Sequence, residues 1–287
     1  MADPIYGLQR RPGSLAQLSR FTNGWNSTMA SFLLPLAFQD IFYKFYDFEN
    51  DTITTDWTVN ESTGASTVFA ASTSLEYGAI QGATTTTDNT TISFNYDGVF
   101  FDANRAPGML VRIKVNTATS TYFEFGFSDA PTQPYTINWV LDTPTLQSNG
   151  TTDVATVVID TDATQKTAAL CAVGTTDTVA VKRNLSAVGF NTNDPDTAKT
   201  NYDVPGVSPI AADTYFTVLI QLNSSAAATA GANSVTANIN GNPLLAGSVA
   251  AGLDTALKLR PYILCGNRST SARTFTIDYI ALWCNRQ

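Results

Sequence analysis

The 287-residue sequence contains no histidine, the side chain most often used for proton transfer near neutral pH. Ser-His-Asp catalysis, Cys-His catalysis and histidine-ligated zinc sites are therefore excluded. The three cysteines, Cys171, Cys265 and Cys284, lie far apart without C-x-x-C spacing, and their odd number predicts free thiols. The sequence also lacks a G-x-x-x-x-G-K-[ST] phosphate-binding loop. Any remaining chemistry has to come from carboxylates.

Paired carboxylates can hydrolyse glycosides without histidine, so the glutamates are the next candidates. The sequence has Glu49, Glu61, Glu76 and Glu124. Glu124 lies among aromatic residues in the middle of the alternating segment 121–127. We expect it to be an ordinary outward-pointing carboxylate on a solvent-exposed sheet face. The chain is accordingly predicted not to be an enzyme.

Aspartate-rich turns are the candidates for a metal site, because calcium binds oxygen ligands. Asp160 and Asp162 flank a threonine, and Asp194 and Asp196 flank a proline. Aspartate is also frequent in turns, since its side chain hydrogen-bonds nearby backbone groups. A turn role is the default for both pairs, so no cofactor is predicted. Calcium at either pair is the alternative, which a titration would test.

These side chains must be positioned by short strands, because apolar and polar residues alternate between turn signals after the first forty residues. In segment 108–116, Val111 and Ile113 point one way while Arg112 and Lys114 point the other. One sheet face should therefore be buried and the other exposed to solvent. We expect strands at 41–48, 55–60, 66–70, 75–81, 90–96, 108–116, 121–127, 135–140, 154–160, 167–173, 178–183, 214–222, 233–239, 257–265 and 273–283.

No ordinary helix is required after residue 40, so the predicted fold class is all-β, with two stacked antiparallel sheets. Segment 190–212 is polar and broken by prolines, which predicts a long loop near 190–212 between two strands. The predicted body, residues 41–287, is a single domain.

The first forty residues are predicted to form an extended N-terminal arm without strand-like alternation. One short helix is expected at 14–21, with Ser14 as its cap. The arm carries more arginine than aspartate, whereas the chain as a whole has a net charge of −8. An apolar arm either wraps its own body or lies on a neighbouring subunit, and we favour the neighbour. The predicted partner-binding residues are Arg10, Arg11, Leu15, Leu18, Phe21, Trp25 and Phe32.

Targeting signals are weak. The N-terminus lacks the apolar stretch of a secretory signal, and the longest apolar run, 32–38, is too short to cross a bilayer. We therefore expect synthesis in a host cytoplasm and no membrane partner. The acidic body carries no platform of interleaved aromatic and basic residues, so no nucleic-acid partner is expected.

Two segments carry a resemblance to a known fold. FYDFENDTITTDWTVNESTGAST at 45–67 and TFTIDYIALW at 274–283 resemble the first and last strands of concanavalin A-like (laminin G-type) jelly rolls. NINGNP at 238–243 resembles a hairpin turn of such proteins, and VVIDTDAT at 157–164 resembles an inner strand. The resemblance implies a jelly-roll sandwich whose last strand runs beside the first. It specifies fold rather than function, because lectins, glycosidases and virion proteins share it.

Glycosidases that resemble this fold use a Glu-x-Asp-x-x-Glu strand, and no glutamate here stands in that pattern. In composition the chain is similar to bacteriophage capsid decoration or cement proteins. That similarity implies a virion structural protein on the capsid surface that forms a homo-oligomer, with a trimer favoured. Its partners would be the major capsid protein or other virion subunits, held by the arm. The alternative is a carbohydrate-binding, lectin-like module of a virion fibre, with binding loops near 142–152 or 190–212.

Overall fold

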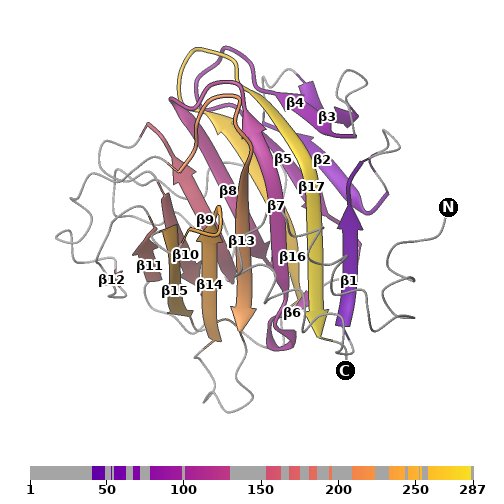
Figure 1. Ribbon diagram of the computed structural model, residues 1–287, viewed down its shortest axis with the longest axis vertical. Coiled ribbons are helices and arrows are strands. Elements are labelled where there is room, and N and C mark those ends of the chain that lie inside the picture. Colours follow the sequence, from indigo (N-terminus) through magenta and orange to yellow (C-terminus); the bar gives the residue numbers. More distant parts are fainter. Residues whose placement is uncertain are drawn as a thin grey trace, which may run out of the picture. The chain divides into compact units, whose positions relative to one another are not determined.

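The computed structural model describes residues 41–48, 53, 55–62, 67–71, 78–98, 101–129, 153–162, 168–174, 181–185, 194–195, 209–223, 233–242, 245–251, 253 and 258–285. The chain divides into two units, one of residues 1–42 with 285–287 and one of residues 43–284. Nearly all described strand residues belong to the second unit, in which the strands form two antiparallel sheets (Figure 1). The predicted all-β sandwich is confirmed.

The first sheet has eight strands, and β1 pairs with β17 beside the main path. The predicted pairing of the first and last strands is therefore present. In spatial order the path is β15 (Ala246–Ala251), β14 (Asn233–Ile239), β13 (Phe216–Asn223), β7 (Gly108–Val115), β17 (Thr274–Asn285), β4 (Ile80–Ala83) and β3 (Thr67–Ala71), with β1 spanning Ile41–Tyr46.

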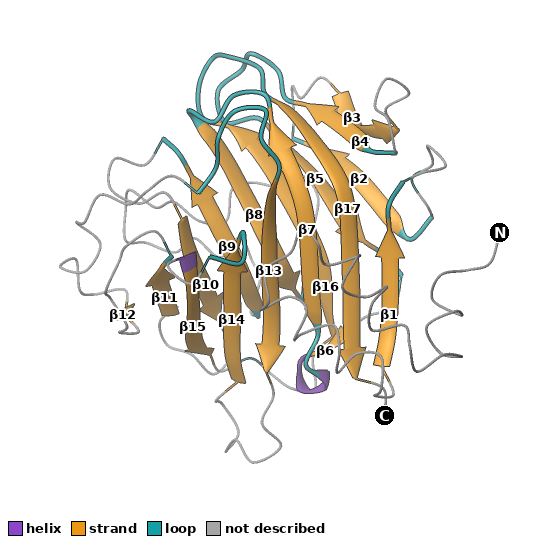
Figure 2. Cartoon of the chain, in the orientation of Figure 1, coloured by secondary structure: helices purple, strands orange, loops and turns teal. Residues whose placement is uncertain are grey.

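The second sheet has nine strands, and the short β6 (Phe101–Asp102) pairs with β16 beside the path. In spatial order the path is β12 (Asp194–Pro195), β11 (Val181–Asn184), β10 (Ala168–Val173), β9 (Val154–Asp160), β8 (Thr121–Ser128), β16 (Lys258–Asn267), β5 (Thr91–Tyr96) and β2 (Trp57–Glu61). A 3₁₀ turn, Ala103–Arg105, follows β6 and is coloured purple beside it in Figure 2.

Most predicted strands match observed ones within a few residues. β6 and β15 were not predicted, and the two-residue β12 lies inside the long loop predicted near 190–212. Pro195 is tolerated there because β12 is the edge strand of its sheet. The strand predicted at 135–140 lies outside the described residues.

The main core lies between the sheets and is built by the alternation of β8. Phe123 packs its ring 5.5 Å from that of Phe216 and 5.3 Å from that of Phe275, which both belong to the eight-stranded sheet. Phe125 and Phe127 project to the same side, and all these rings are fully or almost fully buried. Each such side chain contributes roughly 2–3 kcal/mol of hydrophobic stabilisation, so the aromatic alternation of β8 joins the two layers.

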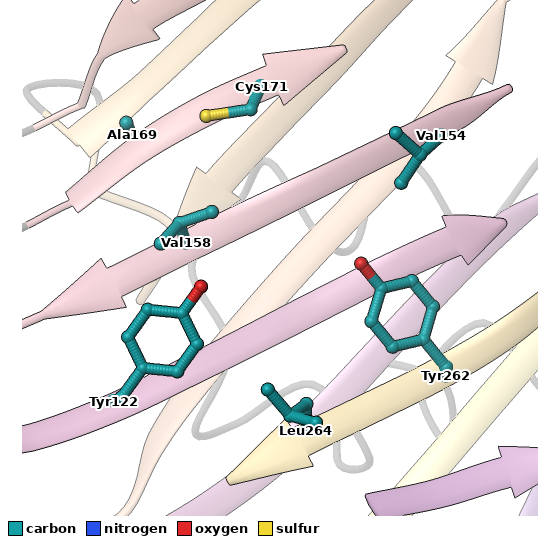
Figure 3. Packing of buried hydrophobic residues seen from close by; sticks show 7 residues of the cluster. All are labelled: Tyr122, Val154, Val158, Ala169, Cys171, Tyr262 and Leu264. Atoms are coloured by element: carbon teal, nitrogen blue, oxygen red, sulfur yellow. The ribbon is translucent and has the colours of Figure 1, made fainter. Parts of the chain in front are cut away.

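The other face of the nine-stranded sheet is also buried, which corrects the expectation of one exposed face. All eight residues of β8 are buried, as are all seven of β9. Side chains from four adjacent strands form a second apolar cluster there: Tyr122, Val154, Val158, Ala169, Cys171, Tyr262 and Leu264 (Figure 3). Local alternation cannot reveal this burial, because it sets which side a residue faces and not what packs against that side.

The outer face of the eight-stranded sheet is more open. In β7 the inward residues are fully buried, whereas Arg112 and Lys114 on the outward side are partly exposed, as the alternation predicts. On neighbouring β13, Thr217, Leu219 and Gln221 are partly exposed too. The two sheets therefore differ at their central strands, since β7 and β13 carry partly exposed polar side chains whereas β8 and β9 are buried on both sides.

Two buried polar side chains fasten the loops at one end of the sandwich, drawn in teal at the top of Figure 2. Asn267 receives hydrogen bonds from Thr90, and its amide donates to carbonyl oxygens of Thr85, Thr87 and Ser269 at 2.8–3.0 Å. The guanidinium of Arg273 is bonded to carbonyl oxygens and one serine hydroxyl, and burial lowers its pKa. These loops are thus held by side-chain bonds to the backbone.

The NINGNP segment forms the tight turn after β14. Asn240 and Gly241 both have positive φ angles, 56° and 62°, and the Asn242 amide donates to the Ile239 carbonyl at 3.0 Å. Two consecutive residues with positive φ define the turn type that favours Asn-Gly. The predicted hairpin turn is confirmed.

Candidate functional site

The predicted partner-binding arm lies outside the described residues. This holds for Arg10, Arg11, Leu15, Leu18, Phe21, Trp25 and Phe32. The short helix predicted at 14–21, loop 142–152 and most of 190–212 lie outside them too. The capsid-binding arm, the trimer and the virion location therefore stay predictions, and the candidate site has to be built from the strands.

Asp160 and Asp162, the first calcium candidates, take part in a hydrogen-bonded turn. The Asp162 amide donates to Asp160 Oδ1 at 3.1 Å, and Arg268 Nη2 lies 2.9 Å from Asp160 Oδ2. Ser120 donates to Asp162 at 3.1 Å. The described residues contain no group of three His, Cys, Asp or Glu side chains that could hold a metal ion. These contacts fit the turn role expected of aspartate.

The second candidate pair is placed only in part. Asp194 begins the edge strand β12, and Asp196 lies outside the described residues. A calcium site there stays untested.

Glu124 points to the expected side of β8, but the prediction that it is exposed to solvent is wrong. Its side chain is fully buried within the second apolar cluster. Tyr122 donates to Oε1 at 2.5 Å and Tyr262 donates to Oε2 at 2.9 Å. Burial, followed by the charge of Glu124, raises the pKa of Tyr122 well above its usual value. In Figure 3 the two tyrosine hydroxyls tilt toward each other from adjacent strands.

The accessible candidate site is on the outer face of the eight-stranded sheet. It runs across four neighbouring strands, from the residue before β13 through β7 and β17 to β1. We call it the tyrosine–arginine surface, made of Tyr43, Phe45, Arg112, Tyr215, Asp278 and Tyr279. Within the described ranges, Tyr43 is the one large hydrophobic side chain that is exposed, at 38%.

An ion pair lies at the centre of this surface. Arg112 Nη1 on β7 donates to Asp278 Oδ2 on β17, and both side chains are partly exposed. The pairing register of β17 shifts between Ile277 and Tyr279, so Asp278 is the extra residue of a β-bulge. The same guanidinium lies 4.3 Å from the centre of the Tyr215 ring. The bulge thus inserts the carboxylate of Asp278 at a position where a regular strand would have continued its backbone pairing with β7.

Aromatic side chains extend the surface toward the first strand. The rings of Phe45 and Tyr279 lie 5.6 Å apart. Burial raises the pKa of Tyr279, and partial desolvation raises the pKa of Tyr43 to about 12. Both tyrosines are therefore neutral at physiological pH, and the charges of the surface come from the ion pair.

Part of this surface follows from the sequence. The alternation of segment 108–116 placed Arg112 outward, but Tyr43, Tyr215 and Asp278 were missed. Their proximity depends on the order of strands far apart in the chain, for which local alternation carries no signal. What the sequence offered was an aromatic first strand and an Asp-Tyr pair in the last.

Comparison with known proteins found similar structures but no similar sequences. No family model matches the chain, and no curated protein matches it. The carbohydrate recognition domain of Emp47p is 12% identical, with a TM-score of 0.49 over 84% of this chain and 94% of that one. Lectin I from Ulex europaeus, solved with the methyl glycoside of α-L-fucose, is 10% identical, with a TM-score of 0.49 over 86% and 99%.

A protein of unknown function from Shewanella oneidensis MR-1 is 13% identical, with a TM-score of 0.48 over 90% of this chain and 94% of that one. At these identities the likeness concerns the arrangement of strands in two antiparallel sheets. In the ranges that the structure covers, no helix is long and apolar enough to span a membrane.

Proposed function

We propose that this chain is a non-enzymatic, lectin-like carbohydrate-binding protein and that the tyrosine–arginine surface is its glycan-binding site. The observation that carries the proposal is an exposed tyrosine ring, Tyr43, on the same open sheet face as the Arg112–Asp278 ion pair. The lectins named above share only a strand arrangement, so the proposal depends on this surface.

The chemistry of a sugar explains why this combination suits it. A sugar ring has an apolar face of C–H groups and a rim of hydroxyls that both donate and accept hydrogen bonds. A partly exposed tyrosine offers a flat apolar ring with a polar hydroxyl, the combination that enriches tyrosine at binding surfaces. Arg112 supplies donors and Asp278 supplies acceptors. The ion pair holds both groups in place before a ligand arrives, which lowers the entropy lost on binding.

The dimensions of the surface suit a short oligosaccharide. Neighbouring strands lie about 4.8 Å apart, so the four strands from β13 to β1 cover three intervals, roughly 14 Å. The rings of Tyr215 and Tyr43 stand toward opposite ends of this row, with the ion pair between them. An oligosaccharide lying across the strands would contact the Tyr215 ring, the Arg112–Asp278 ion pair and the Tyr43 ring in turn.

The proposal is tested with the full chain on a glycan array, followed by titration of the best ligand into wild type, Tyr43→Ala and Tyr43→Phe. We expect Tyr43→Ala to weaken binding at least about tenfold, because an exposed aromatic anchor contributes about 1–2 kcal/mol. Tyr43→Phe keeps the ring and should retain most of the affinity.

Thr58→Ala is the matched control, since Thr58 is an exposed strand residue on the other sheet. Thermal unfolding of each variant shows whether it is folded. A chain that binds no glycan, or a folded Tyr43→Ala protein that binds as wild type does, would refute the proposal.

A further inference from the structure

A cation without an ion-pair partner lies next to the tyrosine–arginine surface. Lys114 is on β7, two residues from Arg112, and its Nζ lies 5.0 Å from the centre of the Tyr215 ring. Across the described ranges, most cationic side chains pair with an aspartate: Lys44, Arg105, Arg112, Arg260 and Arg268. Lys114 makes no such pair with any residue that the structure describes, although the chain as a whole has a net charge of −8.

Arg112 also has hydrogen-bond donors that its bond to Asp278 does not use. Its bond to Asp278 uses Nη1, which leaves the hydrogens of Nε and Nη2 without a protein acceptor among the described residues. Its side chain is 39% exposed, so these donors can reach a ligand. Arg112 and Lys114 project from the same side of β7 over one shared ring, that of Tyr215. Among the described residues, two cations therefore flank a position that receives one carboxylate, that of Asp278.

We propose that this position binds the anionic group of an acidic sugar, a carboxylate or a sulfate. The inference rests on the proposed function and adds the class of glycan. An anion between Lys114 and the free edge of Arg112 would accept charge-assisted hydrogen bonds from both, and the planar guanidinium suits the two oxygens of a carboxylate. The rest of the sugar would then lie along the row toward Tyr43.

The position of Lys114 makes it a specificity determinant rather than a general contact. A neutral sugar can still use Tyr43 and the Arg112–Asp278 pair. Only a charged sugar gains from the ammonium group of Lys114, and that gain falls as added salt screens a partly exposed pair. Preference for acidic over neutral glycans should therefore depend on Lys114 and on ionic strength together.

The test compares three trisaccharides that share one linkage and differ in their repeating unit. The units are galactose, galacturonic acid and sulfated galactose. Affinity for each is measured by titration calorimetry with the full chain at low and at physiological salt. We expect at least one acidic form to bind about tenfold more tightly than the neutral form, with a difference that shrinks at higher salt. The ratio between the two acidic forms tells carboxylate from sulfate.

Lys114→Gln should lower the acidic-to-neutral affinity ratio about tenfold, and Lys114→Arg should keep it. Lys258→Gln is the matched control, because Lys258 is an exposed lysine at the start of β16 in the other sheet. Equal affinity for neutral and acidic forms, or an unchanged ratio in Lys114→Gln, overturns this inference while glycan binding itself stands. Absence of binding to all three and to the array overturns the proposed function as well.

Discussion

The bonds between Glu124 and the two tyrosines should make a measurable contribution to stability. Tyr262→Phe is the simplest change, because it removes one hydroxyl and keeps the buried ring, so no large cavity forms. That hydroxyl donates to Glu124 at 2.9 Å, and both side chains are fully buried. Hydrogen bonds to charged groups contribute about 1.5–3 kcal/mol, so we expect the free energy of unfolding to fall by about 2 kcal/mol.

The assay is urea unfolding of the full chain, followed by circular dichroism and tryptophan fluorescence together. Coincident transitions would justify a two-state free energy. Tyr215→Phe is the matched control, since Tyr215 is half-buried and its described contacts are with cations over its ring. The free energy of unfolding of Tyr215→Phe should stay within about 0.5 kcal/mol of the wild-type value. A Tyr262→Phe protein as stable as the wild type would refute the stabilising role of the Tyr262–Glu124 hydrogen bond.

A second step separates the hydrogen bonds from the shape of the cluster. In Tyr122→Phe/Tyr262→Phe both tyrosine donors are gone, so the buried carboxylate loses these two hydrogen bonds. Adding Glu124→Leu should then recover at least about 1 kcal/mol, because Glu124 faces Val158 and Leu264 on the adjacent strands. A triple variant less stable than the double one would show that the carboxylate is held by something other than the tyrosines.

Three further outcomes are expected. Asn267→Asp should lower the free energy of unfolding by about 3 kcal/mol in urea, because a carboxylate would face the carbonyl oxygens that the amide now binds. Gly126→Ala should give little folded protein by size-exclusion chromatography, since an added Cβ would lie 2.1 Å from the Ala155 carbonyl oxygen. The pKa of Tyr122 is raised in the folded state, so its contribution is complete below pH 10 and is lost as pH rises further. The stability gap between wild type and Tyr122→Phe should therefore shrink by about 1 kcal/mol from pH 9 to pH 11.

Local periodicity was enough to predict the class of fold and most strand positions. Alternation in β7 and β8 assigned each side chain to the correct side of its sheet. It failed for β15, whose sequence AGSVAA has little contrast between its two faces, and for the two-residue β6. A pattern of period two can show a strand only when several residues differ in polarity from their neighbours.

Exposure and the candidate site could not be predicted in the same way. Glu124 and Arg112 are both outward residues of central strands, yet the first is fully buried and the second is 39% exposed on its side chain. Glu124 lies beside apolar residues of β9 and β16, which are distant in sequence, whereas Arg112 pairs with Asp278. Likewise, Tyr43 and Tyr215 belong to the same surface only because β1 pairs with β17, β17 with β7, and β7 with β13.

The asymmetry between the two sheets is the reason why the proposed glycan site lies on the eight-stranded one. A sandwich needs one buried face on each sheet, and the nine-stranded sheet buries both of its faces around β8 and β9. The buried carboxylate of Glu124 on that sheet has a structural role, because it accepts hydrogen bonds from Tyr122 and Tyr262. The eight-stranded sheet keeps partly exposed threonine, glutamine and arginine side chains on its outer face, and Tyr43 lies beside them. Loss of glycan binding in Tyr43→Ala, together with loss of stability but not of binding in Tyr262→Phe, is the combined result that this division of roles requires.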